Sequence, residues 1–183
     1  MTDMLEGMAD GMPPLGSVGR MRVMAAGVRG ARVVEGVLPA SFRDVWLVMG
    51  DLEGGFGAFQ PDMRKVRVES VDGDRVTALA RSRYGPRARL HGVLRPGWCW
   101  LQSRFLVVGM AAEPIGHRET ERPAEGTGEV GIRAGDGDGF GTRVALTGGV
   151  RVPGRAMLLP GAERELRRAL ALLTDRVVGH GPG

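Results

Sequence analysis

The sequence predicts an α+β fold, in which a curved antiparallel sheet of about seven strands and one long C-terminal helix enclose an apolar cavity. Two observations predict it. Between Pro61 and Val152, apolar and polar residues alternate with a period of two in several segments, as in half-exposed antiparallel strands. From Ala162 to Val178, apolar residues recur at spacings of three and four, as in an amphipathic helix. A run of strands followed by a helix indicates an α+β architecture.

Length and composition suit one folded domain. The chain has 183 residues, of which 43% are apolar and 25% are charged. Cys99 is the single cysteine, so neither a disulfide nor a thiolate metal cluster can form within the chain. No apolar run reaches the roughly 20 residues that cross a bilayer, and residues 1–20 lack the apolar region of a signal peptide. We therefore expect a cytoplasmic protein without a membrane span.

The net charge is +4, and nearly all the basic residues are arginine, since Lys65 is the single lysine. These residues are spread along the chain, without the dense basic cluster and interleaved aromatic residues of a nucleic-acid groove. We expect no nucleic-acid partner.

Two parts of the chain are distinguished by their periodicity. Residues 1–26 contain scattered glycines, prolines and methionines without a sustained period, which predicts a flexible N-terminal arm. Residues 27–180 carry the periodic segments and are predicted to form the domain. Within them, residues 117–139 are rich in Glu, Arg, Gly and Asp, which predicts a long charged loop inserted before the last strand.

The first elements of the domain are a strand and two short helices. The strand is predicted over residues 28–37 and ends at Pro39, which cannot donate to a ladder. Ser41 is typical of an N-cap and has Asp44 three residues on, so a helix is predicted to begin there. A glycine-rich turn then leads to a second short helix near Phe56.

The remaining strands are separated by turn residues at Asp72-Gly73, Gly85-Pro86 and Pro96-Gly97. The run from Trp98 to Val108 is predicted as one strand that places Leu101, Ser103 and Phe105 on one face, with a short strand after it over residues 110–115. A last strand over residues 141–152 precedes the long helix, which stops at Gly179.

This order of elements resembles the START-like superfamily, also called SRPBCC, which includes the polyketide cyclase and dehydratase, lipid-transport and Bet v 1-like proteins. The residues that carry the resemblance are Leu38-Pro39-Ala40-Ser41 leading to Val45-Trp46, then Asp51-Leu52, Gly141-Thr142-Arg143 and the terminal helix. The resemblance covers roughly residues 28–178. It implies the helix-grip fold and an internal pocket for a hydrophobic ligand, and it does not fix a reaction.

The alternation predicts which side chains line that pocket. The expected ligand-binding residues are Val68, Ala80, Leu90, Leu101, Phe105, Leu146, Leu166, Leu170 and Leu173. Tyr84 is a candidate catalytic residue, because a phenol in an apolar pocket can donate a proton to a carbonyl; a core tyrosine with a satisfied hydroxyl is the alternative. Ser82 and Ser103 are further candidates that could orient a polar ligand group, and each could equally be a packing residue.

A set of basic residues is predicted on the opposite, convex face, and comprises Arg81, Arg83, Arg89, His91, Arg104 and Arg143. A solvated surface is the ordinary interpretation of such a set, and a site for an acidic partner is the alternative. Since the family's aromatase-type cyclases are thought to use basic residues inside the pocket, this placement weakens a cyclase assignment.

The remaining motif matches do not support a metal or cofactor site, and we expect neither. Residues 126–131 fit the pattern GxGxxG but lack the strand and helix that a dinucleotide site requires. Residues 136–139 resemble part of a calcium loop without its later acidic ligands. The histidines have no metal-ligand spacing.

Three functions are compatible with these observations. The first is binding of a hydrophobic small molecule in an internal cavity, with cofactor-independent cyclisation or dehydration of a secondary metabolite, as a lyase or isomerase. The second is a non-catalytic carrier or sensor of a lipid or apolar metabolite. The third is an interaction module that uses the basic convex face. Neither the ligand nor the oligomeric state follows from the sequence.

Overall fold

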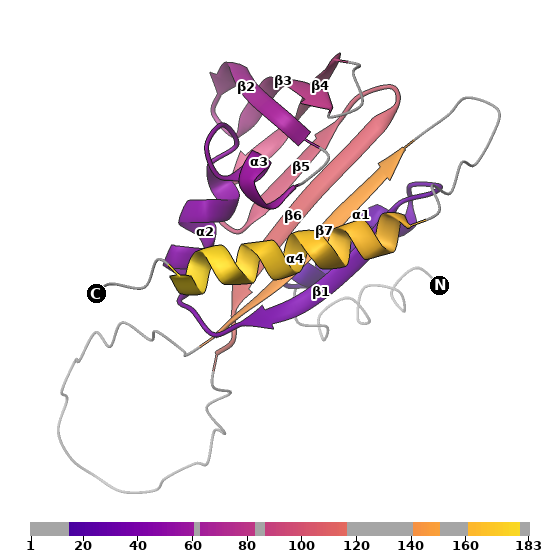
Figure 1. Ribbon diagram of the computed structural model, residues 1–183. Coiled ribbons are helices and arrows are strands. Elements are labelled where there is room, and N and C mark those ends of the chain that lie inside the picture. Colours follow the sequence, from indigo (N-terminus) through magenta and orange to yellow (C-terminus); the bar gives the residue numbers. More distant parts are fainter. Residues whose placement is uncertain (1–14, 61–62, 83–86, 117–140, 151–160, 180–183) are drawn as a thin grey trace, which may run out of the picture.

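Figure 1 shows the computed structural model of the protein, which describes residues 15–60, 63–82, 87–116, 141–150 and 161–179. A single antiparallel sheet of seven strands has the order β1-β7-β6-β5-β4-β3-β2. The strands are β1 (Arg32–Leu38), β2 (Met63–Asp72), β3 (Arg75–Ser82), β4 (Arg87–Arg95), β5 (Trp98–Gln102), β6 (Leu106–Pro114) and β7 (Thr142–Val150). The helices are α1 (Ser17–Ala26), α2 (Phe42–Gly50), α3 (Phe56–Phe59) and α4 (Ala162–Gly179). The predicted α+β class and the long C-terminal helix are confirmed.

The short helix α2 begins where its cap predicts. The Ser41 hydroxyl accepts a hydrogen bond from the backbone N–H of Asp44 at 3.2 Å, and it donates to the Asp44 carboxylate at 2.7 Å. This arrangement satisfies one of the N–H groups that a helix start leaves without a partner. Val45 and Met49, four residues apart, are fully buried and hold the helix against the core.

The inner face of the sheet is covered by α4, which packs against β1, β7, α2 and α3. Its buried side chains, Leu166, Ala169, Leu173 and Val177, follow the predicted spacing of three and four. The Leu170 side chain of α4 approaches β1 closely at Gly36, where a Cβ atom would come within 2.8 Å of Leu170 Cδ2. Glycine at this position therefore allows the helix and the strand to pack in direct contact.

The outer face of the same half of the sheet is covered by α1, which contacts β6, β7 and β1. The flexible arm predicted for residues 1–26 is therefore wrong for residues 17–26, and residues 1–14 lie outside the described part of the chain. The helix has little amphipathic contrast, which is why periodicity missed it, but Val18, Met21 and Ala25 are buried. Gly109 of β6 allows α1 to pack closely on the sheet, since a Cβ atom there would lie 2.8 Å from Met21 Sδ.

The run predicted as one strand from Trp98 to Val108 is a hairpin of β5 and β6. Residues 103–105 form the turn, in which Ser103 Oγ accepts backbone N–H groups of Phe105 and Leu106 at 3.2 and 3.0 Å. The turn reverses the alternation, so Val108 and Met110 face inward and Val107 faces outward. A Ser hydroxyl that accepts backbone N–H groups two and three residues later stabilises a turn. The sequence prediction missed this turn because apolar residues alternate on both sides of it.

Buried residues form two clusters, one on each side of the sheet. The inner cluster contains the apolar side chains between the sheet and α2, α3 and α4. The outer cluster lies under α1 and includes Val18, Met21, Trp98, Trp100 and Val107. None of the helices in the described segments has a stretch long and apolar enough to span a bilayer.

Candidate functional site

The candidate site is the inner cluster, which brings together eight of the nine residues predicted to contact a ligand. Six of these are buried and two are partly buried, and they come from β2, β3, β4, β5, β7 and α4: Ala80, Leu90, Leu101, Leu146, Leu166 and Leu173, with Val68 and Leu170 packed against them. The period-two alternation of the strands and the three-and-four spacing of α4 thus predict correctly that these residues face the interior.

Phe105 does not join this cluster. It lies in the turn between β5 and β6, and 51% of its surface is exposed. Arg104 of the same turn stacks over its ring, with the guanidinium carbon 5.4 Å from the ring centroid. The prediction that Phe105 faces inward beside Leu101 is wrong, because the strand reverses at Ser103.

The inner face is lined with small side chains at one end of the sheet. Ala80 of β3 lies directly opposite Ala88 of β4, and Ala78 of the same strand is also buried. Among the strands, α4 contacts β1 and β7, in the other half of the sheet, and it also packs against α3 and α2. We call the end of the sheet that carries these alanines the alanine end, and it lies at the upper right of Figure 1. It contains the last residues of β3, β5 and β7 and the first residues of β2, β4 and β6, and α4 begins at the same end.

In this structure the described part of the inner cluster is closely packed. Leu90 and Leu101 are 1% exposed, and Leu146 and Leu173 are fully buried. At the alanine end, Ala88 and Leu106 are only partly buried.

The inner cluster offers apolar surface and no charge among its described members. Cys99 of β5 is its one ionisable residue, and burial raises the pKa of the Cys99 thiol to about 12. The thiol is therefore neutral at physiological pH, and it is neither a nucleophile nor a metal ligand in this state. The chemistry available to the described residues is apolar contact and confinement.

The three predicted catalytic residues differ in what the structure shows. The Ser103 hydroxyl binds backbone N–H groups in the turn after β5 and is partly buried there. Ser82 is the last residue of β3, and its side chain lies outside the described part of the structure. Tyr84 belongs to residues 83–86, which are also outside it.

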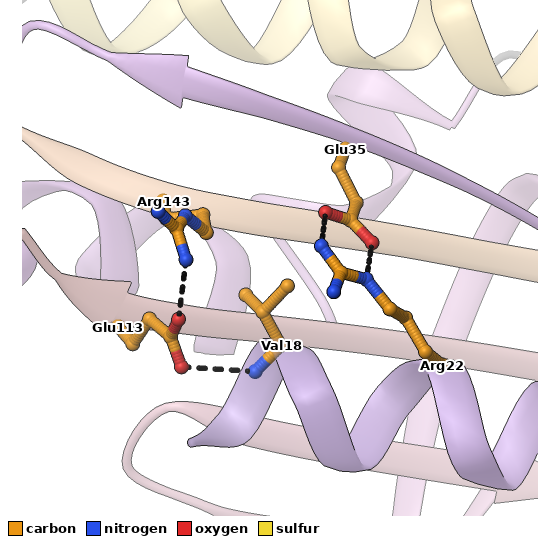
Figure 2. Close-up of polar contacts among 5 residues, drawn as sticks. All are labelled: Val18, Arg22, Glu35, Glu113 and Arg143. Atoms are coloured by element: carbon orange, nitrogen blue, oxygen red, sulfur yellow. Dashed lines mark hydrogen bonds and ion pairs between the residues drawn. The ribbon is translucent and has the colours of Figure 1, made fainter. Parts of the chain in front are cut away.

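The basic residues predicted on the convex face lie in three places. Arg81, Arg89 and His91 share the outer face of β3 and β4, where His91 Nδ1 lies 3.2 Å from the Thr77 hydroxyl. Arg104 is in the turn after β5. Arg143 Nη1 on β7 lies 3.5 Å from Glu113 Oε1 on β6, and Figure 2 shows this ion pair. Arg83 is outside the described residues. The predicted set is therefore not one continuous surface.

Figure 2 also shows the polar contacts that hold α1 on the sheet. Arg22 of α1 makes a double hydrogen bond to the Glu35 carboxylate of β1. This hydrogen bond lowers the pKa of the Glu35 carboxyl, while partial burial opposes the shift. The same bond raises the pKa of the Arg22 guanidinium. Because these groups lie on the opposite side of the sheet from the inner cluster, their role is to position α1.

A concavity of about 530 Å³ lies beside α2 and was not predicted from the sequence. Phe42 and Trp46 of α2 form one side, with ring centroids 6.5 Å apart and planes nearly parallel. Leu94 and Pro96 form part of the other side, and Arg43 and Arg95 also line it. The i,i+4 spacing of two aromatic residues on one helix was the available signal.

Comparison with known proteins identifies the fold. No protein-family model matches the sequence, and no curated protein matches it. Among solved structures, a START superfamily protein from Mycobacterium smegmatis is similar with a TM-score of 0.53 and 13% identity, over 82% of this chain and 99% of that one. The Zhui aromatase/cyclase from a Streptomyces species is similar with a TM-score of 0.55 and 15% identity, over 81% and 94%. A protein from Thermobifida fusca has a TM-score of 0.51 and 13% identity, over 81% and 93%. The protein therefore has the START-like helix-grip fold.

Proposed function

We propose that this protein binds an apolar small molecule between its sheet and α4. The observation that carries the proposal is the inner cluster, an uncharged apolar interior whose covering helix packs mainly on β1 and β7, away from the small side chains of β3 and β4. The helix-grip fold, which includes START proteins and an aromatase/cyclase, supports the same function. The proposed contacts are the eight clustered residues predicted from the sequence, without Phe105.

The ligand would enter at the alanine end, where Ala80 and Ala88 face each other and Ala88 is only partly buried. Transfer of apolar surface from water contributes about 25 cal/mol per Å², so a ring-sized group of about 200 Å² would contribute roughly 5 kcal/mol before the costs of binding. Since no charge has to be desolvated among the described wall residues, desolvation of the wall would take little from this contribution.

The test is native mass spectrometry of the purified protein, beside chromatography of its denatured extract, to detect a co-purified apolar molecule. Ala88→Leu adds bulk to the inner face at the proposed entrance and should reduce the bound fraction by about tenfold, since overpacking of about 1–3 kcal/mol opposes the ligand. Ala31→Leu is the matched control, because Ala31 is also partly buried but packs against the outer cluster.

Retention of the ligand in the Ala31 variant and its loss in the Ala88 variant would support the site. Equal ligand content in both variants would contradict it, as would an absence of ligand in the wild-type protein together with no response to added fatty acids or aromatic polyketides. Thermal unfolding of each variant checks that the difference in ligand content does not arise from loss of the fold.

A second candidate function is cyclisation or dehydration of the bound molecule, and the similarity to the aromatase/cyclase favours it. Confinement of a flexible chain in an apolar interior lowers the entropic barrier to ring closure and excludes water. The reaction also needs a proton donor. We propose Tyr84, which comes between β3 and β4 in the sequence, with Ser82 as an orienting hydroxyl. Ser103 is a weaker candidate because its oxygen already accepts two backbone N–H groups.

Replacement of Tyr84 by Phe distinguishes an enzyme from a non-catalytic carrier. Loss of general acid catalysis should lower the turnover number about 100-fold or more, while the dissociation constant changes less than about threefold. Single-turnover kinetics and equilibrium binding measure the two quantities with the molecule that co-purifies. Unchanged turnover would remove Tyr84 from the mechanism, and no detectable turnover in the wild-type protein would favour the carrier.

A further inference from the structure

A row of cationic residues crosses three neighbouring strands on the outer face of the sheet. Lys65 on β2 lies directly opposite Arg81 on β3, and Arg81 lies directly opposite Arg87 on β4. All three residues are exposed, and neighbouring strands are about 4.8 Å apart. Like charges placed directly opposite one another destabilise a sheet. This row therefore has an unfavourable electrostatic energy that a bound anion would relieve.

The adjacent row on the same face is partly neutralised. It consists of Arg67, Leu79 and Arg89, which also lie opposite one another. Arg89 Nε donates to Glu69 Oε2 at 2.9 Å, and Arg67 Nη2 lies 3.7 Å from Glu69 Oε1. Within the described residues, by contrast, no carboxylate pairs with Lys65, Arg81 or Arg87. The uncompensated positive charge is therefore concentrated in the first row.

The two rows surround a hollow of about 260 Å³. Its lining is contributed by β2, β3 and β4 and consists of Lys65, Arg67, Leu79, Arg81 and Arg87. The register of β2 shifts on both sides of this stretch, between Met63 and Lys65 and between Val68 and Ser70. Such irregularities bend a strand and increase its local twist, which helps to aim these long side chains at a common point.

We propose that this hollow binds a compact multivalent anion of the phosphate or diphosphate class, carried by a small molecule. The arginines offer paired N–H donors that match phosphate oxygens, and Lys65 adds a compact charge. Leu79, which is half-buried, supplies an apolar contact for the part of the ligand next to its phosphate. The site lies on the face of the sheet opposite to the inner cluster, so it functions independently of the apolar site.

The test is isothermal titration of the full-length protein with inorganic diphosphate, with inorganic phosphate and sulfate as comparisons and sodium chloride holding the ionic strength constant. Arg81→Gln removes the central cation of the row and should weaken diphosphate binding at least about tenfold. Arg75→Gln is the matched control. Arg75 is exposed and lies on the same strand and face, six residues and roughly 20 Å away, so binding should change less than about twofold.

A reciprocal variant adds a gain of function. Glu69→Gln releases Arg67 and Arg89 from their carboxylate and should tighten diphosphate binding about threefold, whereas Asp72→Asn, with the same change of net charge farther along β2, should have little effect. Equal weakening by the two arginine variants would overturn the proposal, because the attraction would then be a general property of the protein charge. Binding to phosphatidylcholine vesicles that carry phosphatidic acid, without binding to diphosphate, would overturn the small-molecule assignment.

Discussion

The reactivity of Cys99, on the inner face of the sheet, is determined by its surroundings. It lies between Leu94 of β4 and Met110 of β6 in the sheet, and it is fully buried in the inner cluster. Burial disfavours the thiolate, which raises the pKa of the thiol to about 12. Because the thiolate is the reactive form, the side chain behaves as a small apolar residue.

We therefore expect Cys99 to resist alkylation in the native protein at pH 8. Iodoacetamide should modify the folded protein at least about 100-fold more slowly than the protein in urea, since both the protonation state and the burial of the sulfur protect it. Intact-protein mass spectrometry after timed quenching measures both rates. Rapid single-site modification under native conditions would show that the interior opens to reagents more readily than its packing suggests.

At the scale of the element, α1 is the helix whose stability depends most on its neighbours. Its N-cap is Gly16, which has no side chain to accept from the first N–H groups. Glu113 of β6 takes that role, because its Oε2 accepts the backbone N–H of Val18 at 3.1 Å. Gly16 also leaves room for this carboxylate, since a Cβ atom there would overlap it. The negative charge at a helix N-terminus is favourable, and Arg143 pairs with it from β7.

Replacement of Glu113 by Ala should lower the free energy of unfolding by about 1–2 kcal/mol, because α1 loses its cap and Arg143 loses its partner. Urea unfolding followed by tryptophan fluorescence measures the change, and the signal is suited to α1 because Trp98 and Trp100 lie in the outer cluster beneath it. Glu163→Ala is a control of the same chemistry on the exposed face of α4, where an i,i+4 pair with Arg167 and an acidic charge in the first turn are lost. It should cost less than about 1 kcal/mol. Equal costs for the two variants would indicate that Glu113 does not cap α1.

The two halves of the sheet are used differently in the whole molecule. Around β1 and β7 the sheet is covered on both faces, by α4 on one and α1 on the other, as Figure 1 shows, and β6 packs against α2 and α1. Around β2, β3 and β4 the outer face is exposed and basic, and the inner face carries the facing alanines. The covered half is suited to stability. The other half carries the proposed anion site on its outer face and the proposed entrance to the apolar site on its inner face.

The sequence by itself determined the class of fold, the long amphipathic helix and the inward side of nearly all the predicted wall residues. These depend on periodicity, and periodicity is a local property that follows from the pleat of a strand and the turn of a helix. Val68, Ala80 and Leu173 could be assigned to the interior because each repeats the spacing of its own element.

Only the tertiary structure decided the features that depend on partners far away in the chain. The Glu113 carboxylate caps a helix 95 residues before it, and the row of Lys65, Arg81 and Arg87 exists only because three strands are aligned in one register. Phe105 was misplaced because a single Ser-mediated turn reversed the alternation. Local pattern encodes which face a residue occupies, whereas helix docking, strand register and charge juxtaposition arise from long-range packing that no short segment records.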